Sequence, residues 1–151
     1  MHTWKRIIIA IDESDRSLNA VDYVGRIASQ FADVSLCLLH IYPEPPPDYY
    51  RSGGTLDAYQ KKQDKQAEAM LARASEMLHR QGIPAEAIRS KCLMAYQKSI
   101  SSAILELQEK EGYGTIVVGK RGISKAEEFL FGSISNALIH NGKDIAVWVI
   151  G

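Results

Sequence analysis

The chain has 151 residues, a length that suits one domain with a single hydrophobic core. Apolar residues make up 46% of it, and 18 basic and 18 acidic side chains give a formal net charge of zero. This balance excludes the broad basic field that nucleic acid or an anionic membrane favours. The apolar runs are too short to span a membrane, and Cys37 and Cys92 lack metal-ligand neighbours at CxxC or CxxH spacing. We therefore expect a soluble, cytoplasmic protein with free thiols.

Five segments have the character of strands. Four are apolar and rich in β-branched residues, as strands buried on both faces of a parallel sheet are. They are residues 5–11 (KRIIIAI), 34–42 (VSLCLLHIY), 115–119 (TIVVG) and 145–150 (IAVWVI). Residues 88–95 form a weaker, more polar strand, which indicates a sheet edge.

Helical periodicity fills the intervals between these strands. We predict a helix after the N-cap Ser14, one over residues 55–81, one after the N-cap Ser99, and a short one over residues 133–140. Strands and helices then alternate from end to end. Such alternation implies right-handed crossovers and an open, doubly wound α/β sheet.

One stretch interrupts the alternation, residues 43–54 (PEPPPDYYRSGG). Its prolines and glycines predict a long loop without strand or helix interior. The loop leaves the carboxyl end of the second strand, the side where such sheets bind ligands. A lid over that site and a plain insertion are both compatible with the sequence.

The most informative segment is residues 119–135 (GKRGISKAEEFLFGSIS), with the pattern G-x2-G-x9-G-S at a strand-to-helix junction. Gly119 and Gly122 permit a close backbone approach and a turn with positive φ. Gly132 and Ser133 stand where a helix N-terminus would offer N–H groups to a phosphate. Turn glycines and an N-cap serine would give the same pattern without a ligand. We interpret the segment as an anion cradle, to which the hydroxyl of Ser135 can also contribute.

Asp12 follows the first strand directly. A carboxylate repels phosphate, so its natural partner in a nucleotide is a pair of ribose hydroxyls; a turn or capping aspartate is the alternative. If the first and fourth strands are neighbours, Asp12 and Gly119 face each other across the crevice where the sheet order reverses.

The chain resembles the universal stress protein family. The resemblance rests on KRIIIAIDESDRSLNAV at the start, LLHIYP closing the second strand, TIVVGKRG closing the fourth, and the Gly-Ser helix start. It spans the whole chain, residues 1–151, as one domain. It implies a three-layer α/β/α open sandwich with a five-stranded parallel sheet of order 3-2-1-4-5, the adenine nucleotide alpha hydrolase-like fold. It also implies a homodimer through the last strand, where Trp148 would belong either to the core or to that edge.

The family pattern implies a nucleotide site. By this resemblance, Ala10 and Ile11 line the adenine, Asp12 binds the ribose, and the backbone of Ile41 reads the adenine edge. The remaining matches, to ribose and phosphate contacts, are Val118, Gly119, Arg121, Gly122, Gly132, Ser133, Ile134 and Ser135. The implied ligand is ATP, or AMP or ADP, with Mg²⁺ or Mn²⁺ beside the phosphates. Glu13 departs from the pattern, since the family usually has a small residue there.

The sequence offers no catalytic residue to assign. No P-loop lysine motif is present, and His40 has no acid or nucleophile placed to pair with it, so we expect a hydrogen-bonded strand-end histidine. The preferred interpretation is a regulatory stress-response module that binds ATP with slow hydrolysis at most. The alternatives are an ATPase or adenylyl transferase using the same cleft, and a dimeric interaction module without nucleotide.

Overall fold

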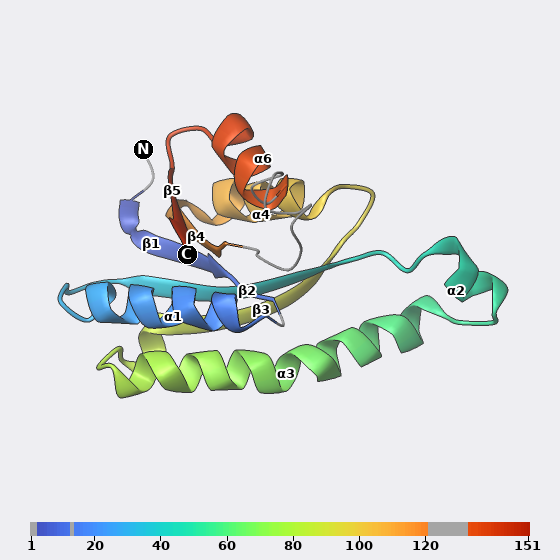
Figure 1. Cartoon of the computed structure of the whole chain (residues 1–151), viewed down its shortest axis with the longest axis horizontal. Helices are drawn as coiled ribbons and strands as arrows, with labels where there is room; N and C mark the ends of the chain where they lie inside the picture. Colours follow the sequence, from blue (N-terminus) through green and yellow to red (C-terminus); the bar gives the residue numbers. More distant parts are fainter. Residues whose placement is uncertain (1–2, 13, 121–132) are drawn as a thin grey trace.

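A five-stranded parallel sheet forms the centre of the molecule in the computed structural model, which describes residues 3–12, 14–120 and 133–151 (Figure 1). The strands are β1 (Thr3–Ala10), β2 (Ser35–Pro43), β3 (Ile88–Ala95), β4 (Tyr113–Gly119) and β5 (Ala146–Ile150). Their order is β3-β2-β1-β4-β5, and every neighbouring pair is parallel. The expected strand order, 3-2-1-4-5, is confirmed.

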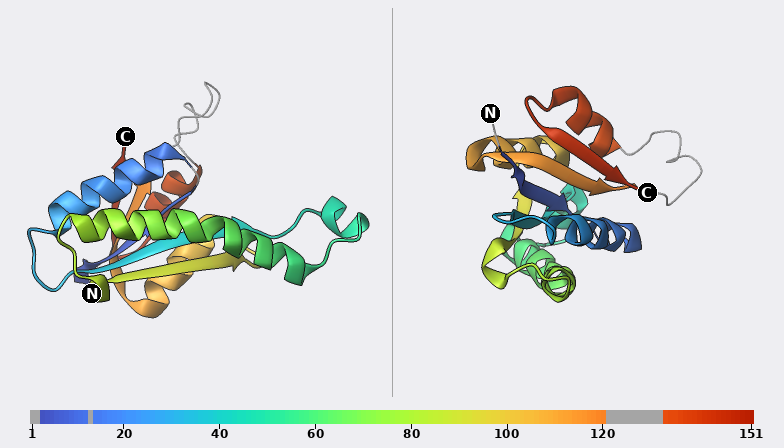
Figure 2. Two further views of the ribbon diagram at one scale, coloured as in Figure 1. Left: turned by 90° about the horizontal axis from the view of Figure 1, so that it is seen from below. Right: turned by 90° about the vertical axis from the view of Figure 1, so that its left-hand side faces the viewer.

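Helices cover both faces of this sheet. They are α1 (Asp15–Ala28), α2 (Pro47–Arg51), α3 (Leu56–Arg80), α4 (Ile100–Glu111) and α6 (Ser133–Asn141), with a 3₁₀ turn η1 (Ala85–Ala87) before β3. α1 and α3 lie together on one side, and α4 and α6 lie on the other (Figure 2). The expected α/β/α sandwich is therefore present. Within the described residues, no helix combines the length and apolarity needed to cross a membrane.

The sheet separates two apolar cores because successive side chains of a strand point to opposite faces. Ile7 and Ile9 of β1 pack with α1 and α3, whereas Ile8 packs in the cluster that contains residues of α4 and α6. All three side chains are at most 1% exposed. This double burial explains the uninterrupted apolar run of the first strand.

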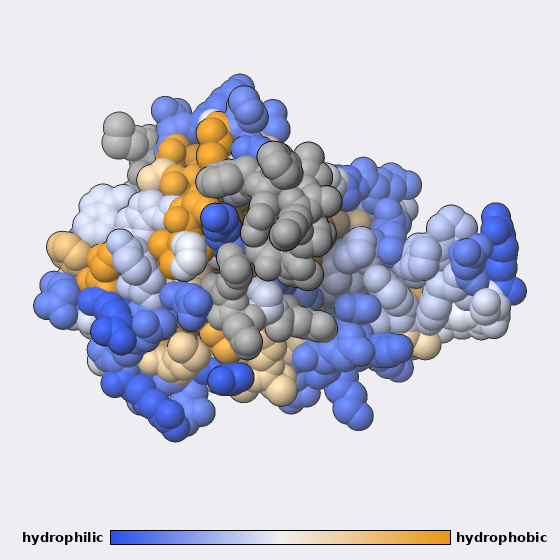
Figure 3. Space-filling model, in the orientation of Figure 1, coloured by the Kyte–Doolittle hydropathy of each residue, from blue (hydrophilic) through white to orange (hydrophobic). Residues whose placement is uncertain are grey.

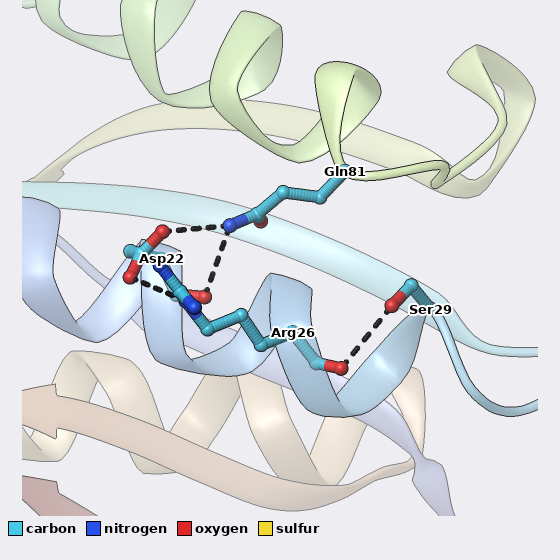
Figure 4. A network of polar contacts seen from close by, with 4 residues as sticks. All are labelled: Asp22, Arg26, Ser29 and Gln81. Carbon is cyan, nitrogen blue, oxygen red and sulfur yellow. Dashed lines mark hydrogen bonds and ion pairs between the residues drawn. The ribbon is translucent and has the colours of Figure 1, made fainter.

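The side chains of Asp22 and Gln81 join the two helices of the first layer. The Nε2 group of Gln81, just past the end of α3, lies 2.7 Å from the carboxylate Oδ1 of Asp22 on α1 (Figure 4). The same carboxylate accepts from Arg26 Nε at 2.9 Å. These contacts fix the C-terminal end of α3 against the middle of α1.

The prediction that residues 43–54 form a long loop without regular structure is wrong. β2 extends to Pro43, and Pro47–Arg51 form the short helix α2. Proline suits the first turn of a helix because the N–H groups there need no intrahelical partner. Thr55 then caps α3 by accepting a hydrogen bond from Ala58 N. Figure 1 shows α2 and the start of α3 projecting beyond the sheet.

Candidate functional site

A pocket opens at the carboxyl ends of β1, β2 and β4, where the sheet order reverses. It is lined by Ala10, Ile11, Asp12, Ser14, Ser17, Leu39, Ile41, Ile100, Ile104, Val118, Gly119, Ile134 and Ser135. The structure thus brings together eight of the residues that the sequence pattern selected. They are Ala10, Ile11, Asp12, Ile41, Val118, Gly119, Ile134 and Ser135.

This pocket has a volume of about 60 Å³. Pockets that bury a small organic ligand usually measure about 300–1,000 Å³. The described walls therefore leave less space than a small organic ligand usually occupies. Gly119 and Ile134, which both line the pocket, stand on either side of residues 121–132 in the sequence.

Local hydrogen bonds hold Asp12 at the start of α1. Its carboxylate Oδ1 accepts from the backbone N–H of Ser14 at 2.8 Å and also from the Ser14 hydroxyl. Its backbone N–H donates to Ser17 Oγ at 3.1 Å. Ser14 is the N-cap residue of α1, as expected, but its hydroxyl points to Asp12 and makes no capping bond. The carboxylate is thereby oriented before any ligand arrives.

His40 fixes the end of β1 from the neighbouring strand. Its Nδ1 lies 2.9 Å from the backbone oxygen of Ile11, and because a carbonyl only accepts, this bond places a proton on Nδ1. The backbone N–H of Ile11 in turn donates to Leu39 O at 2.8 Å. The prediction of a hydrogen-bonded strand-end histidine is confirmed.

The apolar wall of the pocket comes from α4 and β2. Ile100 and Ile104 occupy successive turns of α4, and Leu39 and Ile41 reach the pocket from β2. Ser99 positions the helix start, because its hydroxyl accepts from Ser102 N at 3.1 Å. The sequence predicts a helix that includes Ile100 and Ile104 but does not assign them to the site. Their i, i+4 spacing shows an apolar face without showing what that face contacts.

The opposite wall is formed by the ends of β4 and the start of α6. Val118 is 6% exposed and Ser135 is 6% exposed, so both side chains face inward. Ser133 begins α6, as predicted. Its side chain, and the predicted phosphate-binding residues Arg121, Gly122 and Gly132, lie outside what the structure describes.

Metal ligands are not grouped in the described part of the chain, where no set of three or more His, Cys, Asp or Glu side chains could hold an ion. Asp12 is the acidic side chain among the pocket residues. Asp12 could therefore contribute one carboxylate to a cation bound mainly by phosphate oxygens, as Mg²⁺ commonly is.

Two curated relatives match most or all of the chain. The chain is 30% identical over 151 residues to universal stress protein A homolog 1 of Coxiella burnetii, covering 99% of each protein. It is 27% identical over 145 residues to universal stress protein YxiE of Bacillus subtilis, covering 88% of this chain and 90% of the relative.

Solved structures share the fold at lower identity. Universal stress protein UspA from Lactobacillus plantarum superposes with a TM-score of 0.76 at 15% identity, covering 98% of each chain. A universal stress protein in complex with cAMP gives 0.67 at 23% identity, covering 97% of this chain and 95% of the other. The Archaeoglobus fulgidus protein in complex with dAMP gives 0.65 at 19% identity, covering 100% of each.

The family model described as "Universal stress protein family" matches residues 3–150, which include all five strands and every described helix. The 30% identity to the Coxiella burnetii protein over the full length supports the same family at the level of sequence. The chain belongs to the universal stress protein family.

Proposed function

We propose that the pocket binds an adenine nucleotide, ATP with a divalent cation, and that occupancy regulates the protein in a stress response. The observation that carries the proposal is the pocket itself. Residues from the ends of three strands and the start of α6 converge on it, at the point where open α/β sheets bind ligands. The complexes of two structural relatives with cAMP and dAMP support an adenine ligand.

The chemistry of the walls suits the parts of a nucleotide. Ile11, Ile41 and Ile104 offer apolar contact to a flat base. The Asp12 carboxylate is an acceptor for ribose hydroxyls. Gly119 and the start of α6 would guide the phosphates, and Arg121, Gly122, Gly132 and Ser133 complete this assignment on the family pattern.

A binding role is preferred to rapid turnover. His40 is committed to the Ile11 carbonyl, so it is not aimed at a reacting phosphate. Phosphoryl transfer relies on precisely positioned charge and metal. The described walls supply one carboxylate, from Asp12, three serine hydroxyls, and no cationic side chain. We therefore propose slow hydrolysis at most.

We also propose a homodimer that forms through β5, in a reducing cytoplasm. The strand lies at the edge of the sheet, and four of its five side chains are half-buried without a strand beyond them in the described chain. The free thiols of Cys37 and Cys92 are consistent with a reducing compartment.

Calorimetric titration of nucleotide-free protein tests the nucleotide proposal, using ATP with Mg²⁺ beside AMP, cAMP and GTP. We expect micromolar ATP binding and weaker GTP binding, since the 6-position and 2-position groups of guanine differ from those of adenine. Absence of binding by every nucleotide would leave a dimeric interaction module as the function.

The substitution Asp12→Asn tests the ribose role. It preserves size and the bond from Ser14 N but removes the charge, so we expect ATP affinity to fall about tenfold, the range of one hydrogen bond to a charged group. Asp57→Asn, on the exposed first turn of α3, is the matched control and should bind as the wild type does. If both variants bind ATP with equal affinity, Asp12 does not contact the ribose.

A further inference from the structure

The edge strand β3 has one face that the helices cover only in part. On that side of the sheet α4 packs over β2 and β4, and α6 packs over β5. Side chains alternate along a strand, so Leu93 shares its face with Arg89 and Lys91. Leu93 is 41% exposed. The second helical layer therefore covers β3 only in part, where Glu111 of α4 pairs with Lys91.

A groove of about 540 Å³ follows this face, between the end of β3, α4 and the start of α3. Three large hydrophobic side chains in it are exposed to solvent: Leu56 by 39%, Leu93 by 41% and Tyr96 by 57%. Ala103 and Leu107 of α4 form its opposite wall. Apolar side chains gathered in one groove indicate a contact surface more than scattered ones do.

The charge around the groove is positive, although the whole chain is neutral. Arg89 and Lys91 stand on this strand face, and Lys98 and Lys110 line the groove. Two acids oppose these four cations, because Lys91 pairs with Glu111 and Lys98 pairs with Glu106. In the described chain, Arg89 and Lys110 form no ion pair. With the Glu44 carboxylate, which accepts from Gln97 N beside Tyr96, also counted, the surface keeps a local charge of about +1.

We propose that this groove docks an acidic amphipathic helix of another protein. The 12 residues of α4 make a wall about 18 Å long at 1.5 Å per residue, which matches a partner helix of about 12 residues. Apolar side chains at i, i+3, i+4 and i+7 of that helix would fill the space over Leu93 and Leu107. Acidic residues on its flanks would meet Arg89 and Lys110.

The docking groove and the nucleotide pocket share one helix. Ile100 and Ile104 of α4 line the pocket, while Ala103 and Leu107 line the groove. A partner in the groove would therefore contact the reverse side of the pocket wall. Docking itself rests on the groove alone and does not require that the pocket bind a nucleotide.

Phage display tests the proposal. A library of random 16-residue peptides is panned on the full chain. We expect the recovered peptides to carry an acidic excess and apolar residues at helical spacing. Compared with the wild type, the Leu93→Glu variant should bind the synthesised peptides at least tenfold more weakly, and the Lys110→Glu variant at least threefold more weakly. Amide resonances of Tyr96, Ala103 and Leu107 should shift on binding.

The control variant is Tyr23→Glu, which places the same charge on a 46% exposed aromatic position of α1, on the other side of the sheet. It should bind the peptides as the wild type does. Circular dichroism shows whether each variant is folded. If Leu93→Glu does not fold, Lys110→Glu alone tests the groove. The proposal is overturned by peptides without acidic excess, by affinity unchanged in a folded groove variant, or by failure to select any peptide. Loss of self-association in Leu93→Glu, measured by sedimentation, would instead identify a second copy as the occupant.

Discussion

Gly114 shows how tightly a single residue can be constrained in this fold. The register between β1 and β4 shifts between Thr3 and Ile7, and Gly114 of β4 lies beside the first residues of β1. A Cβ on Gly114 would lie 2.3 Å from the backbone oxygen of Thr3 and 2.8 Å from Trp4 N. These are backbone atoms, so no rotamer change can relieve the contact.

We expect Gly114→Ala to lower the free energy of unfolding by about 1–3 kcal/mol or more, the range for overpacking a closed site. Urea denaturation of the wild type and the variant measures this difference. Gly151→Ala is the control, because nothing lies within 4 Å of the position of its Cβ. A Gly114→Ala variant as stable as the wild type would show that the two strands can separate there at little cost.

The site residues differ in how far the sequence could identify them. Asp12 and Gly119 could be predicted because each stands at the end of an apolar strand, and strand ends meet at the ligand side of such sheets. Ile104 and Ser17 could not. A helical apolar residue and a first-turn serine look the same whether they face a core, a pocket or solvent, and only the packing of α1 and α4 on the sheet decides this.

At the scale of elements, the side chains of Lys91 and Glu111 tie the edge strand β3 to the end of α4. The pair is partly buried, with side-chain exposures of 28% and 23%. The hydrogen bond from Lys91 lowers the pKa of the Glu111 carboxyl below its ordinary value of 4.5. A carboxyl with a lowered pKa in the folded state stabilises the fold above its unfolded pKa, and this contribution is lost as pH falls through the folded pKa.

We therefore expect wild type to exceed Glu111→Gln in free energy of unfolding by roughly 1 kcal/mol at neutral pH. The difference should shrink as the pH falls below 4.5, since the protonated acid then resembles the amide. Urea titrations across that pH range measure it. Glu76→Gln, which breaks an exposed pair with Arg80, should cost less at every pH. A difference for Glu111→Gln that stays constant with pH would mean that its carboxylate charge is not what stabilises the contact.

The elements themselves were largely predictable, because each buried strand is a continuous apolar run and each helix is bounded by a recognisable signal. Thr55 and Ser99 cap α3 and α4 as such residues do, and Gly82 at φ 100° follows α3. The exception is α2. Its five residues are too few to show periodicity, and a local side-chain contact helps to hold them, the bond from the Tyr49 hydroxyl to Thr55 O.

At the scale of the whole molecule, alternation of strands and helices predicts a doubly wound sheet but not the order of its strands. The order came from the family resemblance, and the structure confirms it. That order has two consequences. The order reverses between β1 and β4, and the pocket lies at that point. The order also leaves β3 and β5 as the two edges of the sheet.

The two edges differ in character. β3 carries exposed charged and polar residues, such as Arg89 and Ser90, which discourage pairing through that strand. β5 consists of Ala146, Val147, Trp148, Val149 and Ile150. Figure 3 shows an apolar strip over β5, which continues onto α6, where Ile139 is 54% exposed. The proposed dimer would bury this strip and pair the backbone groups of the edge.

A lysine on β5 should therefore weaken the dimer without disturbing the monomer. Ala146 is exposed at the start of the strand, so Ala146→Lys leaves both cores unchanged. Twofold symmetry introduces the charge twice into one interface, and we expect the dimer dissociation constant to rise about tenfold or more. Sedimentation velocity across a concentration series measures this. Ser90→Lys, on the other edge strand, is the matched control and should leave the dimer intact. If wild type is monomeric, or if both variants associate equally, the apolar strip on β5 must serve a different contact.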